Sequence, residues 1–148
     1  MATFDDFGYE RGDRYAISEW VKFQALQGKP IYILDAWKAE GKFGPQLRFI
    51  FAASNGTDAK VFASSTGSEL ISRQVLGVKA SGTLPRFAQI EKYDSEKSPQ
   101  GYGWRLKDIQ DTCPEPGRTL MVAAALAAKE SAKQEDHDAP DLPDDLPF

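Results

Sequence analysis

The segment between residues 31 and 54 constrains the fold more than any other part of the chain. IYILDAWK (31–38) and QLRFIFAAS (46–54) are rich in β-branched and aromatic residues, which predicts two strands. EGKFGP (40–45) lies between them and carries the glycines and proline typical of a turn. The segment therefore predicts a β-hairpin with a loop of about five to seven residues, and the fold must contain a sheet.

The body after this hairpin predicts a helix inserted among further strands. AKVFASS (59–65) predicts a third strand. TGSELISRQVLGVKASG (66–82) predicts a helix with an acid in its first turn and a glycine after its end. LPRFAQIEKYD (84–94) and YGWRLKDIQ (102–110) predict a fourth and a fifth strand.

The segment before the hairpin predicts a short helix. ISEWVKFQALQGKP (17–30) offers Ser18 as an N-cap, and Gly28 with Pro30 would end the helix. Residues 2–15 are polar and aromatic without a clear period, so they predict a loop or a short edge strand.

The fold class that follows is mainly β with α. Five strands with a helix between the third and the fourth, β-β-β-α-β-β, is the order of the OB-fold, a partly open five-stranded barrel. That barrel binds oligonucleotides on its mid-strand face and on the loops between strands one and two and between strands four and five. Some other small α+β barrel or sheet is the alternative.

The chain divides into a body and a charged tail. Residues 1–118 predict the OB-fold domain, and 119–134 are alanine-rich and predict a helix or a linker. Residues 135–148 hold six acids and no Lys or Arg, which leaves 16 acids against all 18 bases in the rest of the chain. The tail is therefore at −6 and the body at +2. A tail this charged and rich in proline predicts a disordered interaction segment.

Enzyme chemistry finds little support in the residue types. Cys113 and His137 are the only cysteine and histidine, so the body has no disulfide, no Ser-His or Cys-His pair and no cysteine-based zinc site. Glycine-rich phosphate loops are absent, and no carboxylates are spaced to converge on a metal. Asp35 within an apolar strand predicts a lone buried acid, a bulge or an open face. The sequence thus predicts a non-enzyme without a cofactor.

The location of the protein is also predicted by what the sequence lacks. The N-terminus has no basic start followed by an apolar run, and Leu120–Ala128 is too short an apolar stretch to span a bilayer. We therefore expect a cytoplasmic protein with no membrane partner.

Basic and aromatic residues alternate repeatedly through the predicted strands. Single-stranded nucleic acid requires cations along its backbone and flat rings on which its bases stack. Phe43 at the hairpin tip is the ring most favoured for stacking, whereas Phe49 and Phe51 are favoured for the core and Trp20 for packing. The predicted DNA-binding residues are Trp37, Lys38, Lys42, Phe43, Arg48, Lys60, Phe62, Arg86, Tyr93, Tyr102, Trp104, Arg105 and Lys107.

The last six residues, PDDLPF (143–148), resemble the acidic tip of bacterial single-stranded DNA-binding proteins. In that family the tip recruits replication, recombination and repair proteins, while the OB-fold body coats DNA. The resemblance implies that Asp144, Asp145, Leu146, Pro147 and Phe148 bind a partner protein. Phe148 suits an apolar pocket and its carboxylate suits a basic residue on the pocket rim.

The body departs from that family, since its opening strand and its usual linker are not found. This departure implies a divergent member, encoded by a bacteriophage or a mobile element, that is a monomer or a homodimer. The expected function is single-stranded DNA binding in replication, recombination or repair. The alternative is a protein-interaction adaptor in a replication complex that binds no DNA itself.

Overall fold

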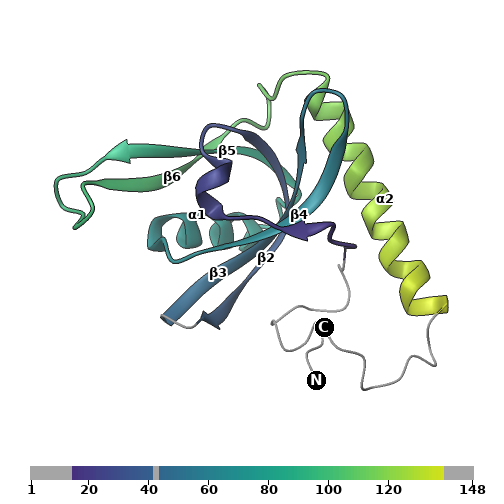
Figure 1. Cartoon of the computed structure of the whole chain (residues 1–148), viewed down its shortest axis with the longest axis horizontal. Coiled ribbons are helices and arrows are strands. Elements are labelled where there is room, and N and C mark those ends of the chain that lie inside the picture. Colours follow the sequence, from purple (N-terminus) through teal and green to yellow (C-terminus); the bar gives the residue numbers. More distant parts are fainter. Residues whose placement is uncertain (1–14, 42–43, 139–148) are drawn as a thin grey trace.

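The computed structural model describes residues 15–41 and 44–138, and over this part the fold is mainly β with two α-helices (Figure 1). One open, mixed sheet of six strands has the order β1-β4-β3-β2-β5-β6. The neighbouring strands run antiparallel except for β1 and β4, which are parallel. The elements are β1 (Glu19–Trp20), the 3-10 helix η3 (Phe23–Leu26), β2 (Pro30–Gly41), β3 (Gly44–Ser54), β4 (Ala59–Thr66), α1 (Glu69–Ala80), β5 (Arg86–Asp94), β6 (Tyr102–Asp108) and α2 (Gly117–Asp138).

The five strands and the intervening helix that the sequence predicts are all present. They are β2 to β6 and α1, each within a few residues of the predicted bounds. Over the described residues these strands form one open sheet, with a sixth strand, β1, on the edge beside β4, and not a closed barrel.

The segment before the hairpin is not the predicted helix. It forms β1 and η3 instead, because the edge of β4 offers it hydrogen bonds. Val21 N–H donates to the carbonyl of Ala63, and the Ser64 hydroxyl donates to the carbonyl of Val21. Ser18, the expected N-cap, lies before β1, and its N–H donates to the carbonyl of Val61. Tertiary hydrogen bonding overrides the local helical pattern here.

A β-bulge in β2 separates the two hairpins of the sheet. β2 pairs with β5 only from Pro30 to Ile33, and its register with β3 shifts between Ile33 and Asp35. Beyond the shift, β2 continues with β3 alone, and the hairpins β2–β3 and β5–β6 diverge with α1 between them (Figure 1). A bulge bends its strand and increases the local twist.

Asp35 at this bulge binds the last turn of α1. The Lys79 ammonium lies 2.9 Å from Asp35 Oδ1 and donates to the carbonyl of Ala36 at 2.7 Å. The same Oδ1 accepts the N–H of Ala36 at 2.8 Å. Asp35 is only 6% exposed, so its charge must be compensated inside the fold. Of the alternatives left open for Asp35, the structure shows a bulge with a paired acid.

Helix α1 has regular signals at both ends. Ser68 caps it, with its hydroxyl accepting the N–H of Ile71, and Lys79 lies in the last turn. Gly82 follows with a φ of 74°, a left-handed conformation in which a side chain would be strained. Ile71 and Val75 face the sheet. They join the α1-side core, whose other members include Phe23, Leu26, Ile31, Ile33, Phe49, Phe51 and Ile90.

Helix α2 covers the opposite face of the sheet. Met121, Ala125, Ala128 and Ala132 form its buried stripe, at the helical spacing that the alanine-rich sequence favours. The α2-side core contains Met121, Ala125 and Ala128 together with Leu34, Trp37, Ile50, Ala52, Val61 and Phe87. Of the two alternatives for residues 119–134, a helix or a linker, the structure shows a helix. It continues to Asp138, four residues into the segment expected to be disordered.

Replacing Lys79 by Met should destabilise the fold, because the carboxylate of Asp35 would lose its counter-ion. The loss in the free energy of unfolding should be about 2–3 kcal/mol, somewhat less than for a fully buried pair since Lys79 is partly exposed. Urea denaturation measures it, with Lys38→Met on the exposed part of β2 as the matched control. Equal stability of the two variants would contradict a structural role for the pair.

Candidate nucleic-acid interface

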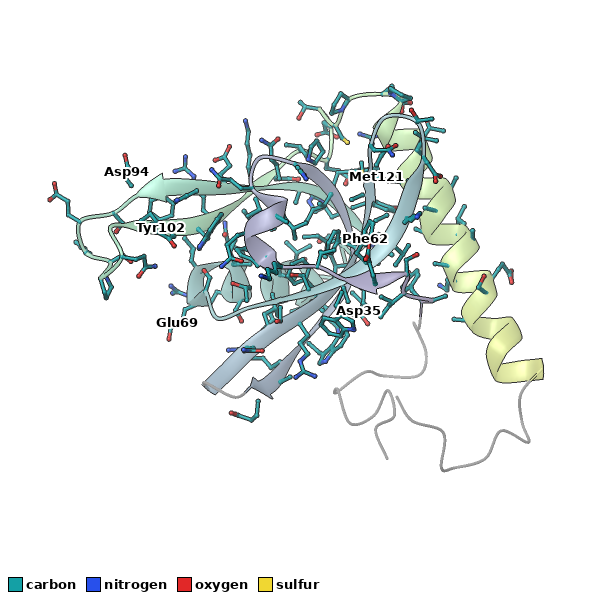
Figure 2. All side chains as sticks on the ribbon, in the orientation of Figure 1. Asp35, Phe62, Glu69, Asp94, Tyr102 and Met121 are labelled. Atoms are coloured by element: carbon teal, nitrogen blue, oxygen red, sulfur yellow. The ribbon has the colours of Figure 1, made fainter. Side chains whose placement is uncertain are left out.

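A groove of about 780 Å³ lies between the segment carrying β1 and η3, the connection from β4 to α1, and the hairpin β5–β6. Figure 2 labels Tyr102 on this hairpin, where it projects from the body. The groove thus lies between the two edge strands of the sheet, β1 and β6. Its lining residues are Trp20 to Gln24, Ser65 to Ser68, Leu70, Tyr93, Ser95, Ser98, Gln100 and Tyr102 to Trp104.

Aromatic rings form the walls of this groove. Trp20 is 50% exposed, the greatest exposure of any large apolar side chain in the groove. Tyr102 and Trp104 lie edge to face with their centroids 5.9 Å apart. Trp104 is held from the other side by Phe23, at 5.1 Å. Rings fixed in this way can accept a stacked base without a large loss of side-chain entropy.

The charge of the groove favours an anionic ligand. Among the residues that the structure describes, Lys22 is the one charged residue of the lining, so these residues contribute a cation and no carboxylate. Lys92 adds a second positive charge nearby, with its ammonium 4.0 Å from the centroid of the Tyr102 ring. The polar part of the lining also includes the side chains of Gln24, Ser65, Thr66, Ser68, Tyr93, Ser95, Ser98, Gln100 and Tyr102.

The structure brings only some of the predicted DNA-binding residues to this groove. Tyr93, Tyr102 and Trp104 line it. Tyr93 also packs under the Arg105 guanidinium, at 5.4 Å from the ring centroid. Arg105 itself is paired with Glu91 at 3.0 Å, while Lys38 and Lys107 are exposed on β2 and β6.

Trp37 is corrected to a core residue. It is 8% exposed and belongs to the α2-side core, so its ring offers no face to a base. The prediction went wrong because α2 covers the face of the sheet that was expected to bind DNA. Arg48, opposite Trp37 in the strand register, points to the same face and is half-buried.

Lys60 and Phe62 lie on the opposite face of the sheet from Trp37. Val61 between them packs in the α2-side core, so these two side chains point to the opposite face of β4. They line a second hollow of about 310 Å³, to which Lys29 contributes another cation. Val21 lines both this hollow and the groove, so the two are adjacent.

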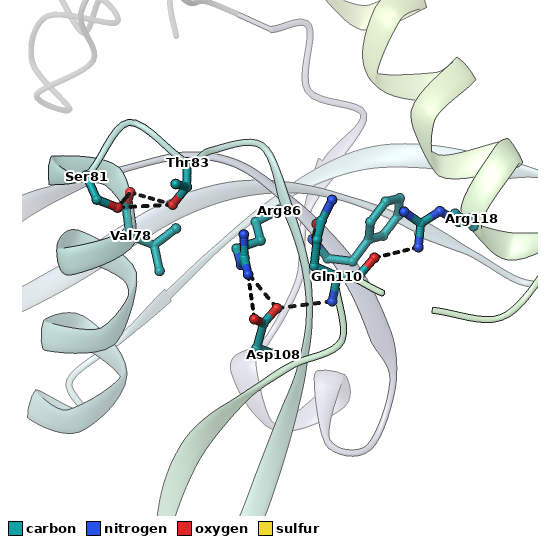
Figure 3. Close-up of polar contacts among 8 residues, drawn as sticks. Val78, Ser81, Thr83, Arg86, Asp108, Gln110 and Arg118 are labelled. Carbon is teal, nitrogen blue, oxygen red and sulfur yellow. Dashed lines mark hydrogen bonds and ion pairs between the residues drawn. The ribbon is translucent and has the colours of Figure 1, made fainter. Parts of the chain in front are cut away.

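Arg86 forms an ion pair with Asp108, so its guanidinium already has an acidic partner in place of the predicted phosphate. Its guanidinium makes two hydrogen bonds to Asp108, at 2.6 and 3.1 Å, and Asp108 also accepts the N–H of Gln110 (Figure 3). The bond to Asp108 raises the pKa of Arg86, and the bond to Arg86 lowers the pKa of Asp108. The pair joins the first residue of β5 to the last residue of β6.

Several predicted residues lie outside the described residues. They are Lys42 and Phe43 at the hairpin tip, and Asp144, Asp145, Leu146, Pro147 and Phe148 at the C-terminus.

Sequence reasoning missed Trp20 as a surface ring and Lys22 as a groove cation. The local pattern of residues 17–30 predicts a helix with Trp20 on its packing side. The exposed position of Trp20 follows from the pairing of β1 with β4, a contact between segments more than 40 residues apart. Only a prediction of that pairing could have revealed it.

Comparison with protein-family models, with characterised protein sequences and with solved structures finds no match to this chain. Among residues 15–41 and 44–138, no group of three or more His, Cys, Asp or Glu side chains is arranged to hold a metal ion. Cys113 is buried, and this burial raises the pKa of its thiol. No helix within the described residues has the length and apolar character needed to cross a bilayer.

The Arg86–Asp108 pair makes stability depend on pH at the acid end. Asp108 has a folded-state pKa below its ordinary value of 3.8, so its ionised form stabilises the fold at higher pH. That contribution is lost as the pH falls through the folded-state pKa. Thermal melting from neutral pH to below about pH 4 should therefore show a steeper loss for the wild type than for Asp108→Asn.

Because both side chains of the pair are substantially exposed, the difference should be small. Asp94→Asn, at the far end of β5, serves as the control and should retain the wild-type slope. If the melting temperature of Asp108→Asn falls with pH as steeply as that of the wild type, the Arg86–Asp108 pair is not the cause of the acid sensitivity.

Proposed function

We propose that this protein binds single-stranded nucleic acid, DNA foremost, in the groove between β1 and β6, and that it does so as a non-enzymatic member of the OB-fold class. The order of β2 to β6, with α1 between the third and fourth of them, supports this fold class. The groove is then the gap between β1 and β6, and the segment of β1 and η3 packs against β4.

One observation carries the proposal: the rings of Trp20, Tyr102 and Trp104 gather in a single groove, to which the described part of the chain contributes Lys22 and no carboxylate. Every base has a π-face, so rings of this kind bind bases of any sequence, and each stack is worth about 1–3 kcal/mol. Cations beside the rings attract the phosphates. Paired bases are already stacked within a duplex, so exposed rings favour single strands.

A second part of the proposal concerns the C-terminal tip. Asp144, Asp145, Leu146, Pro147 and Phe148 recruit partner proteins of replication, recombination or repair, as the resemblance of the tip implies. The terminal Phe and its carboxylate suit an apolar pocket with a basic rim, and the aspartates steer the tail toward that rim. DNA binding and partner binding are thereby divided between the body and the tail.

The substitution Trp20→Ala should weaken DNA binding without unfolding the protein, because the ring is half exposed. The anisotropy of a fluorescein-labelled oligo-dT should report a loss of about 1–3 kcal/mol in binding free energy. The affinity of the wild type should also fall steeply from about 50 to 200 mM salt.

Leu126→Ala is the control, since Leu126 is a large apolar residue on α2 that is 64% exposed and does not line the groove. A duplex of the same length should compete poorly for the wild type. The proposal is wrong if oligo-dT does not bind, or if its affinity does not change with salt concentration. Pull-down of replication proteins without any DNA binding would favour the adaptor alternative.

Deleting residues 141–148 should leave DNA binding intact or make it tighter. The deletion removes acidic charge that competes with DNA for basic groups on the body. The double variant Leu146→Ala/Phe148→Ala keeps that charge, so it should bind DNA as the wild type does while losing its partner proteins. Loss of DNA binding on deletion would contradict the division between body and tail.

A further inference from the structure

The outer edge of β6 carries backbone groups that face the groove. β6 is the last strand of the sheet, and β5 is its neighbour on one side. At Leu106 the groups that point away from β5 are both satisfied by Gln74 of α1. The Leu106 N–H donates to Gln74 Oε1 at 2.8 Å, and Gln74 Nε2 donates to the Leu106 carbonyl at 3.1 Å.

The same outward orientation recurs at Trp104 and Tyr102. Residue pairs in an antiparallel ladder alternate between those that exchange backbone hydrogen bonds and those that do not. Leu106 and Ile90 form a pair that does not exchange backbone hydrogen bonds. Because the two kinds alternate, the next such pairs are Trp104 with Lys92 and Tyr102 with Asp94. The N–H and C=O of Trp104 and Tyr102 therefore point away from β5.

These outward-pointing groups belong to residues that line the groove, unlike those of Leu106. Tyr102 and Trp104 both line the groove, whereas Leu106 lies beyond it under Gln74. Within residues 15–41 and 44–138, no other strand pairs with this edge. An edge with open donors and acceptors inside a groove is a site for a ligand that supplies the matching groups.

Gln74 indicates which chemistry this edge accepts. Its planar carboxamide presents one acceptor and one donor side by side, and both bond to a single residue of β6. The Watson–Crick edge of a nucleobase presents the same arrangement, as in the carbonyl and N3–H of thymine. Single-stranded bases expose this edge, and proteins that recognise single strands use it.

We propose that the backbone edge of β6 at Tyr102 and Trp104 hydrogen-bonds to the Watson–Crick edges of unpaired bases in the groove. This inference rests on the proposed function and specifies how its site holds a base. Tyr102 then acts twice, with its ring as a stacking surface and with its backbone as a hydrogen-bonding group. Duplex DNA is excluded because its Watson–Crick edges are already occupied.

The pair of substitutions Tyr102→Ala and Tyr102→Pro separates these two contributions. Both variants lose the ring, but only Tyr102→Pro also loses the N–H. Proline is tolerated at the first residue of an edge strand whose N–H faces outward, which is the position of Tyr102. Tyr102→Pro should bind oligo-dT about tenfold more weakly than Tyr102→Ala, as expected for one lost hydrogen bond. Thermal melting verifies that both variants fold.

A modified oligonucleotide tests the same contact in the wild-type protein. An oligomer of N3-methylthymidine keeps the rings and the phosphates of oligo-dT but blocks the N3–H donor. The wild type should bind it about tenfold less tightly than oligo-dT. The ratio between the two oligomers should be smaller for Tyr102→Pro than for Tyr102→Ala.

The outcomes separate this inference from the proposed function. If oligo-dT and its N3-methyl form bind the wild type equally well, base-edge recognition is overturned while single-strand binding stands. If neither oligomer binds the wild type, the proposed function fails together with the inference. If Tyr102→Pro binds DNA like Tyr102→Ala but alone loses a protein partner, the edge serves peptide docking and the inference is overturned.

Discussion

The contact between Asp35 and Lys79 fixes the relative positions of the sheet and α1. The buried carboxylate lies where β2 leaves β5 and continues with β3, and its counter-ion comes from the last turn of the helix. This places α1 between the two diverging hairpins. Gln74 in the middle of the helix then reaches the edge of β6, and the capped N-terminus of the helix reaches the groove. The site depends on this placement, since α1 connects β2, β6 and the groove lining.

Helix α2 covers one face of the sheet and leaves the groove between β1 and β6 open. α2 covers the face of the sheet that carries Trp37, while the segment of β1 and η3 lies against β4 on the other side of the groove from β6. The rings in the groove come from two distant parts of the sequence, the segment of Trp20 and Phe23 and the hairpin β5–β6. Their convergence is a property of the tertiary structure, and it gathers aromatic rings in the groove that we propose as the binding site.

The strands and helices with strong local signals could be predicted from the sequence. The turn at residues 40–45, and Glu69 and Gly82 at the two ends of α1, mark boundaries that the structure reproduces within a few residues. The predictions fail where contacts between distant parts of the sequence determine the conformation. Residues 17–30 have a helical pattern but pair with β4, Trp37 is buried by α2, and Arg86 is neutralised by Asp108. The β6 edge carries no residue signal at all, because its chemistry resides in the backbone.

The central claim is that single-stranded nucleic acid occupies the groove between β1 and β6, and amide NMR with a short oligo-dT tests it most directly. The three tryptophan indoles report on three different surroundings in one spectrum. The account predicts shifts for the indoles of Trp20 and Trp104 and for the backbone amides of Tyr102 and Trp104, with the indole of buried Trp37 and the amides of α2 unchanged. Shifts confined to α2, or no shifts at all, would contradict it.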